Sequence, residues 1–224
     1  MSGLIVLAMM SLFGPDEIEN TNAVPERVYT KLAYAADTPA TRPADRVSPL
    51  VFIDPGHGGK KNHGCRGYDG RFESEANLLL ALAVRDELVK AGVEAMMTRE
   101  DDSDVPLYER PRRAHELKAD AFVSIHHNAP AAGKDPLAVR YRAVYSWNDL
   151  GQRLAEAIAA RLAPCDSLHA NFAVTRSPEI PSVLVEADFL THPDGCREAF
   201  DPERRAQIAR AIAQGILDWL AANR

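Results

Sequence analysis

The 224-residue sequence contains only three cysteines, Cys65, Cys165 and Cys196. A set this sparse and odd in number excludes a disulfide framework, although one disulfide between two of the three is compatible with the sequence. No two cysteines are spaced as C-x-x-C, so the sequence lacks the pattern of a structural zinc site built on thiolates. We interpret Cys65 as a small buried or loop thiol, with a catalytic role as the alternative.

The sequence also lacks an excess of positive charge, because its formal net charge is −6 at pH 7. Proteins that bind nucleic acid usually carry a basic face, and clusters of Lys and Arg attract a protein to anionic membranes. We therefore expect no nucleic-acid partner, and the composition gives no polybasic patch for a membrane.

No hydrophobic run reaches the roughly 20 residues that a transmembrane helix needs, so we expect no transmembrane span. The apolar run Leu4–Phe13 has the length of the middle of a secretion signal, although the usual positive residues before it are missing. Ala33-Tyr34-Ala35 resembles a cleavage site but lies well beyond this run. We predict an exported protein, periplasmic or in the cell wall or medium; a short amphipathic pro-segment is the alternative for this region.

The stretch Thr38–Ser48 is rich in Pro, Thr and Ala, which is typical of an unstructured linker. We therefore divide the chain in two. Residues 1–47 form a signal-like segment or pro-segment with its linker, and residues 48–224 form one globular domain. The hydrophobic content of 46% is enough for a sizeable core in a domain of this length.

Short apolar runs alternate with helical patterns along the domain. The expected strands are Leu50–Ile53, Val93–Thr98, Ala121–Ile125, Val139–Ser146 and Ser182–Val185, and the expected helices are Ser74–Ala91, Pro106–Lys118, Leu150–Leu162 and Pro202–Ala222. Pro111 is expected to kink the second helix or to delay its start. The alternation predicts an α/β fold: a single domain with a mostly parallel, twisted sheet of about six strands and helices on both faces.

Residues able to bind a metal follow the predicted strands. His57 follows the first strand in Asp-Pro-Gly-His-Gly-Gly, and His126 and Glu186 come directly after two later strands. In open α/β sheets, sites form beyond the carboxyl ends of strands, so we expect these side chains to share one site. For His57 the alternative is a glycine-rich turn without a function.

Glu73 opens the first long helix, where an acidic residue is favoured by the helix dipole whether or not it binds anything; Glu75 competes with it for a role as ligand. Neighbouring strand residues face opposite ways. We therefore expect His126 to point into the site and His127 to face a groove or solvent. The alternatives are a structural His126 and an ion pair between Glu186 and Arg176.

Two histidines, one carboxylate and an open position make the ligand set of a hydrolytic zinc. On this interpretation His57, Glu73 and His126 bind one Zn²⁺, and Glu186 acts on a water bound there. Asp54 either orients His57 or caps its loop. The expected chemistry is hydrolysis by metal-activated water.

From about Pro49 to Trp219 the sequence resembles the zinc-dependent N-acetylmuramoyl-L-alanine amidases (Amidase_3-type catalytic domains), which strip peptides from cell-wall glycan. The matching segments occur in the family's order: VFIDPGHGG, ESEANL, MMTREDD, LYERPRRAHELKADAFVSIHHNA, IPSVLVEADFLTHPDG and IARAIAQGI. By position, the resemblance implies His57, Glu73 and His126 as zinc ligands and Glu186 as the catalytic glutamate.

The resemblance implies hydrolysis of the amide between N-acetylmuramic acid and L-alanine of peptidoglycan, and we expect a monomer. The chain departs from the family at Asp188 (commonly Gly), at Thr191-His192 (commonly Ser-Asn), at His127 (usually a small residue) and at His115 (usually Asn). Two alternatives remain: a zinc peptidase or amidase acting on another amide, and an inactive homologue that only binds the cell wall.

Overall fold

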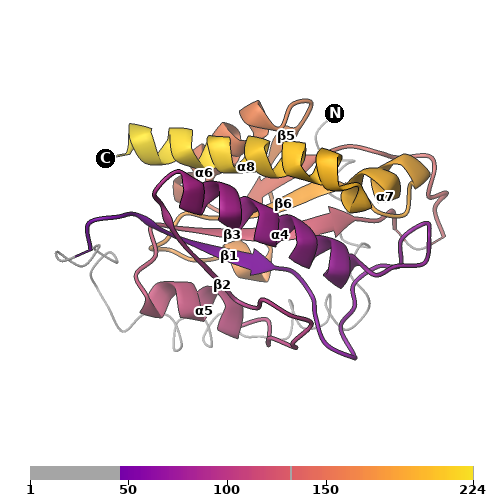
Figure 1. The fold of residues 1–224 in the computed structure, drawn as a ribbon, viewed down its shortest axis with the longest axis horizontal. Helices are drawn as coiled ribbons and strands as arrows, with labels where there is room; N and C mark the ends of the chain where they lie inside the picture. Colours follow the sequence, from indigo (N-terminus) through magenta and orange to yellow (C-terminus); the bar gives the residue numbers. More distant parts are fainter. Residues whose placement is uncertain (1–45, 132, 224) are drawn as a thin grey trace.

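The computed structural model describes residues 46–131 and 133–223, so the predictions for the secretion signal and its cleavage site lie outside the described residues. A six-stranded sheet in the order β2-β1-β3-β6-β4-β5 forms the centre (Figure 1). Its strands are β1 (Leu50–Pro55), β2 (Glu94–Met97), β3 (Ala121–Asn128), β4 (Ala143–Ser146), β5 (Asp166–His169) and β6 (Ser182–Phe189). Only the β4–β6 pair is antiparallel, which confirms the mostly parallel sheet.

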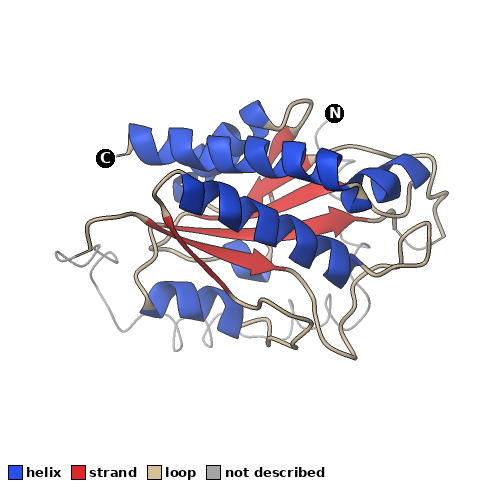
Figure 2. Cartoon of the chain, viewed as in Figure 1, coloured by secondary structure: helices blue, strands red, loops and turns tan. Residues whose placement is uncertain are grey.

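Helices cover both faces of the sheet, as predicted (Figures 1 and 2). One face carries α4 (Glu73–Lys90), α6 (Asp149–Arg161) and α8 (Pro202–Ala222), and the other carries α5 (Glu109–Glu116) and the 3₁₀ turn η1 (Ala173–Thr175). Along β1, Val51 and Ile53 face the first layer while Leu50 and Phe52 face the second. Burial on both faces explains why the strands read as continuous apolar runs.

Three elements of the described residues were not predicted from the sequence: the 3₁₀ turn η1, the strand β5 and the helix α7 (Pro193–Phe200). The edge strand β5 carries polar and partly exposed residues, so it shows no apolar run. The helix α7 is short and begins with a proline after the capping residue His192. The second predicted helix starts late, at Glu109, which places Pro111 in the first turn, where no backbone N–H is needed.

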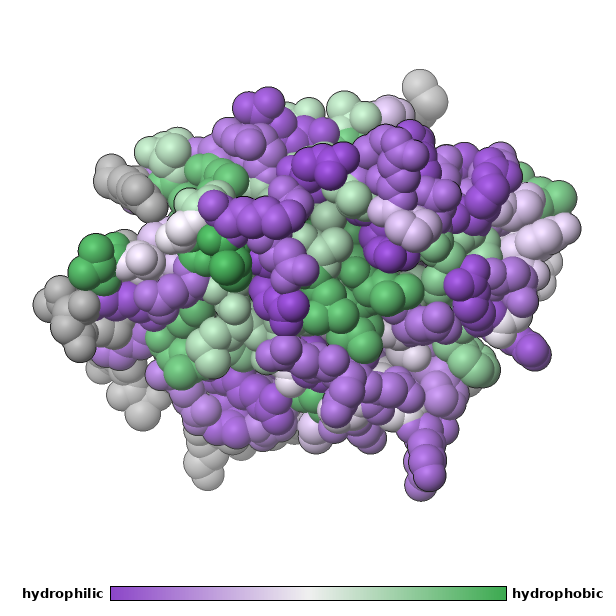
Figure 3. All heavy atoms as spheres, viewed as in Figure 1, coloured by the Kyte–Doolittle hydropathy of each residue, from purple (hydrophilic) through white to green (hydrophobic). Residues whose placement is uncertain are grey.

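The face seen in Figure 3 is mostly hydrophilic, with apolar patches that include one over α4. Within residues 46–131 and 133–223, no helix combines the length and the apolar character that crossing a bilayer requires. All three cysteines lie in this part of the chain, and each is a free thiol.

Candidate metal centre

The loop after β1 presents His57 in a backbone conformation that few residues adopt. Its φ angle is +59°, in the left-handed region that is uncommon for residues other than glycine. Two buried arginines hold this loop through its backbone carbonyl oxygens. Arg99 donates to the carbonyl oxygens of Pro55 and Gly56. Arg110 donates to those of Pro55 and His57. The strained position of His57 is therefore fixed by a network of hydrogen bonds.

Asp54 anchors this network. Its carboxylate accepts hydrogen bonds from Thr98 and Ser124 and forms a buried ion pair with Arg110 at 2.9 Å. Burial alone would raise the pKa of Asp54, but Arg110 and the two hydroxyl groups hold it below its usual value. These contacts favour the second of the two roles predicted for Asp54, because its carboxylate supports the loop through Arg110, which also donates to the carbonyl oxygen of His57.

Replacing Arg110 with Met should lower the free energy of unfolding by about 3–5 kcal/mol, because it leaves the Asp54 carboxylate buried without its partner. Arg112→Met, which removes exposed ion pairs from the same helix, should change it far less. Urea denaturation measures both values.

Since the folded-state pKa of Asp54 is lowered, its contribution to stability is present above the unfolded pKa of about 3.9 and is lost as the pH falls. Equal effects of the two substitutions would contradict this account.

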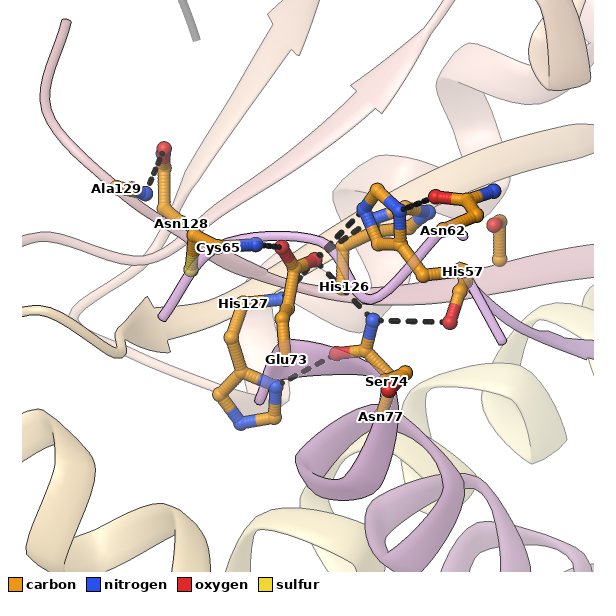
Figure 4. A network of polar contacts seen from close by, with 12 residues as sticks. His57, Asn62, Cys65, Glu73, Ser74, Asn77, His126, His127, Asn128 and Ala129 are labelled. Atoms are coloured by element: carbon orange, nitrogen blue, oxygen red, sulfur yellow. Dashed lines mark hydrogen bonds and ion pairs between the residues drawn. The ribbon is translucent and has the colours of Figure 1, made fainter. Parts of the chain in front are cut away.

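The structure brings His57, Glu73 and His126 together. Glu73 Oε1 lies 3.3 Å from His57 Nε2 and 3.0 Å from His126 Nδ1, and one ligand atom from each residue lies within 4.8 Å of the others. All three side chains are buried and point toward one another (Figure 4). Glu75, the competing carboxylate, is exposed.

This arrangement fits one zinc ion. Ligands at 2.0–2.2 Å from a tetrahedral zinc lie roughly 3.3–3.5 Å from one another, close to the separations seen here. The donor set also has the right chemistry, two imidazoles and one carboxylate. Gly56 is part of the fit, because a Cβ atom at this position would lie 2.1 Å from His126 Nε2.

Three contacts that orient these side chains were not predicted from the sequence. Asn62 Oδ1 lies 2.6 Å from His57 Nδ1, which leaves Nε2 facing Glu73. The backbone N–H of Cys65 donates to Glu73 Oε2 at 2.9 Å, and Asn77 Nδ2 donates to Glu73 Oε1 at 3.1 Å. Of these partners only Asn77 belongs to a motif segment, ESEANL; Asn62 and Cys65 lie in the loop between residues 59 and 73, and only the folded chain shows which groups meet.

The pKa of Glu73 favours its ionised form. Burial alone would raise this pKa, but His57 and His126 lower it well below its usual value. An ionised carboxylate is the form that binds a metal.

The two adjacent histidines of β3 point to opposite sides of the strand. His126 faces the site, as predicted, but His127 is only 3% exposed and hydrogen-bonds Asn77 of α4. The prediction that His127 faces solvent is therefore wrong, because α4 covers that side of the sheet, although His127 is among the residues that line the cavity. Burial lowers the pKa of His127 to about 4, so its ring is neutral at pH 7.

Glu186 lies in β6 directly opposite His126 in the β3–β6 register, and it is 5% exposed. It lines a cavity of about 560 Å³ together with His57, Glu73 and His126. Arg176, the alternative ion-pair partner from the sequence, donates to Asn171. The cavity thus combines a possible metal site with a carboxylate placed beside it.

Comparison with known proteins places the chain in a family. The sequence profile described as N-acetylmuramoyl-L-alanine amidase matches residues 51–218. The chain belongs to the N-acetylmuramoyl-L-alanine amidase family. A relative in this family, the amidase AmiA of Salmonella typhimurium, is 33% identical over 219 residues, covering 76% of this chain and 75% of AmiA.

Solved structures of amidases in this family share the fold. The catalytic domain of CwlV from Bacillus (Paenibacillus) polymyxa matches with a TM-score of 0.71 and 31% identity, covering 77% of this chain and 98% of that domain. The amidase AmiC2 of Nostoc punctiforme matches with a TM-score of 0.71 and 35% identity, covering 77% and 97%. The single-domain α/β fold is thus that of amidase catalytic domains.

Proposed function

We propose that this chain hydrolyses the amide between N-acetylmuramic acid and L-alanine of peptidoglycan, with one zinc ion held by His57, Glu73 and His126 and with Glu186 as the catalytic residue. The observation that supports this proposal most is the convergence of the three ligand side chains beside Glu186 in one cavity. Membership of the amidase family supports the choice of substrate.

A zinc ion held by His57, Glu73 and His126 would supply water of lowered pKa and would polarise the scissile carbonyl. Glu186 accepts a proton from the attacking water and then donates a proton to the leaving nitrogen. The water oxygen joins the lactyl carbonyl carbon, the C–N bond breaks, and the products are a lactyl carboxylate and a free L-alanine amine. Asn62 and Asn77 hold His57 and Glu73 in position throughout.

The cavity wall has two chemically different parts. Besides the site residues, it is lined by the apolar side chains of Val105, Pro106, Leu107 and Val174. The polar part suits the amide that is cut, and the apolar part suits the methyl and methylene groups of the chain on either side of it.

Digestion of purified sacculi tests this function. We expect release of stem peptides with free L-alanine amino termini and an equal number of new lactyl carboxyl groups, and we expect a chelator to stop both. Release of fragments from a different amide would favour the alternative peptidase. Binding to sacculi without cleavage by the zinc-loaded protein would favour the inactive wall-binding homologue.

We propose that the chain is exported to the periplasm or the cell wall and that residues 1–47 carry the export signal. On this proposal residues 48–224 form the catalytic domain. We also propose that the enzyme acts as a monomer. Arg46 contacts the domain at Leu117, Lys118 and Asp120. A chain that begins at Arg46 should therefore keep the melting temperature and the sacculus-digesting activity of residues 1–224. Loss of either would show that the preceding segment is part of the folded enzyme.

A further inference from the structure

His127 is the residue of the His-His pair that the proposed mechanism does not use. It lies in β3 between His126 and Asn128, and its side chain turns away from His126 toward α4 (Figure 4). There its Nδ1 lies 2.9 Å from Asn77 Oδ1. Both side chains are buried, His127 at 3% and Asn77 at 0% exposure.

The hydrogen bonds of Asn77 determine which group donates in this contact. Its Nδ2 group donates to Glu73 Oε1 at 3.1 Å and to the Gly56 carbonyl oxygen at 3.2 Å. Both partners only accept hydrogen bonds, so this end of the carboxamide is the NH₂ group and the other end is the oxygen. The proton between Asn77 Oδ1 and His127 therefore belongs to His127 Nδ1.

A carboxamide has two ends of similar shape and opposite polarity, so its orientation depends on its partners. If Asn77 turned over, its oxygen would face the Glu73 carboxylate and its NH₂ group would face His127. With its proton on Nδ1, the ring of His127 opposes this, because two donors would then meet in a buried place; the turned carboxamide would require the proton to move to Nε2 as well. His127 thus keeps a donor directed at the carboxylate that we assign to the metal.

We propose that His127 is a positioning residue for the zinc site, which acts on Glu73 through Asn77. The proposal rests on the proposed role of Glu73 as a ligand. Residues that hold metal ligands in place typically contribute about 10–100-fold to metal affinity.

Two substitutions of nearly equal size separate the hydrogen bond from the packing of the ring. In His127→Asn, the side-chain NH₂ group can occupy the place of Nδ1, whereas His127→Leu has the same branching and no donor. Both variants lose the rest of the ring equally. We expect the zinc affinity of His127→Leu, measured by competition with a chromophoric chelator, to fall about 10–100-fold and that of His127→Asn to recover most of the loss.

The visible spectrum of the Co²⁺-loaded proteins provides a second measurement, because it responds to the geometry of the ligands. The spectrum should differ from wild type in His127→Leu and resemble it in His127→Asn. Equal zinc affinities of the two variants, whether both high or both low, would overturn the proposal.

A double substitution tests the path through Asn77. If His127 acts only through this carboxamide, the zinc affinity of the double variant His127→Leu/Asn77→Leu should equal that of Asn77→Leu alone. A double variant whose loss is the product of the two single losses would contradict the path. A wild-type chain that binds no zinc would instead refute the proposed function.

Discussion

Replacing Glu186 with Gln should lower kcat on peptidoglycan by about 10²–10⁴-fold, the contribution typical of a general acid–base residue, while the protein still binds one zinc per chain. Glutamine keeps the shape of the side chain, but its amide cannot accept a proton from water at neutral pH. Peptide release from sacculi and zinc content by elemental analysis give the two numbers. The predicted combination is a filled metal site with little turnover.

The control for this substitution is Glu75→Gln, which neutralises an exposed carboxylate at the start of α4 and should leave the rate unchanged. Full activity of Glu186→Gln would show that another group handles the proton. Loss of zinc from this variant would show that Glu186 belongs to the ligands rather than to the proton-transfer step.

Removing a proposed ligand should instead lower the zinc content of the protein. His57→Ala leaves two of the three proposed ligands, so zinc content after dialysis should fall from one per chain to a small fraction, and activity should fall with it. Zinc should also raise the melting temperature of the wild type, because a ligand that binds only the folded state stabilises it. It should not raise that of His57→Ala.

His169→Ala is the matched control for this experiment, since His169 is exposed and stacks on Trp147 in the loop before α6. It should keep both zinc and activity. If His57→Ala retained one zinc per chain that dialysis does not remove, the proposed ligand set would be wrong.

The main elements of the fold could be predicted because local sequence determines them. The helix α4 begins and ends within one residue of its predicted bounds, since its apolar spacing is regular and Gly92 ends it with a φ of +80°. The strand β5 could not be predicted, because its pairing with β4 depends on contacts that its own polar residues do not reveal. The intrinsic β-propensity of its residues predicts such an edge strand poorly.

The candidate site was predictable to the level of its motifs and no further. The order of strands brings His57, His126 and Glu186 to the same end of the sheet, as expected for parallel strands. Asp54 pairs with Arg110, and His127 bonds Asn77, only because the fold places these residues next to each other. A single sequence does not contain that information in a local pattern, so the sequence left the role of Asp54 open between two alternatives and did not reveal that His127 is buried.

Anomalous diffraction at the zinc absorption edge, from crystals of the full chain grown with zinc, tests the central claim most directly. The account predicts one strong peak about 2.0–2.2 Å from His57 Nε2, His126 Nδ1 and a Glu73 carboxylate oxygen, with a fourth position open toward Glu186. A peak bound by other residues, or no peak between these three side chains, would contradict it.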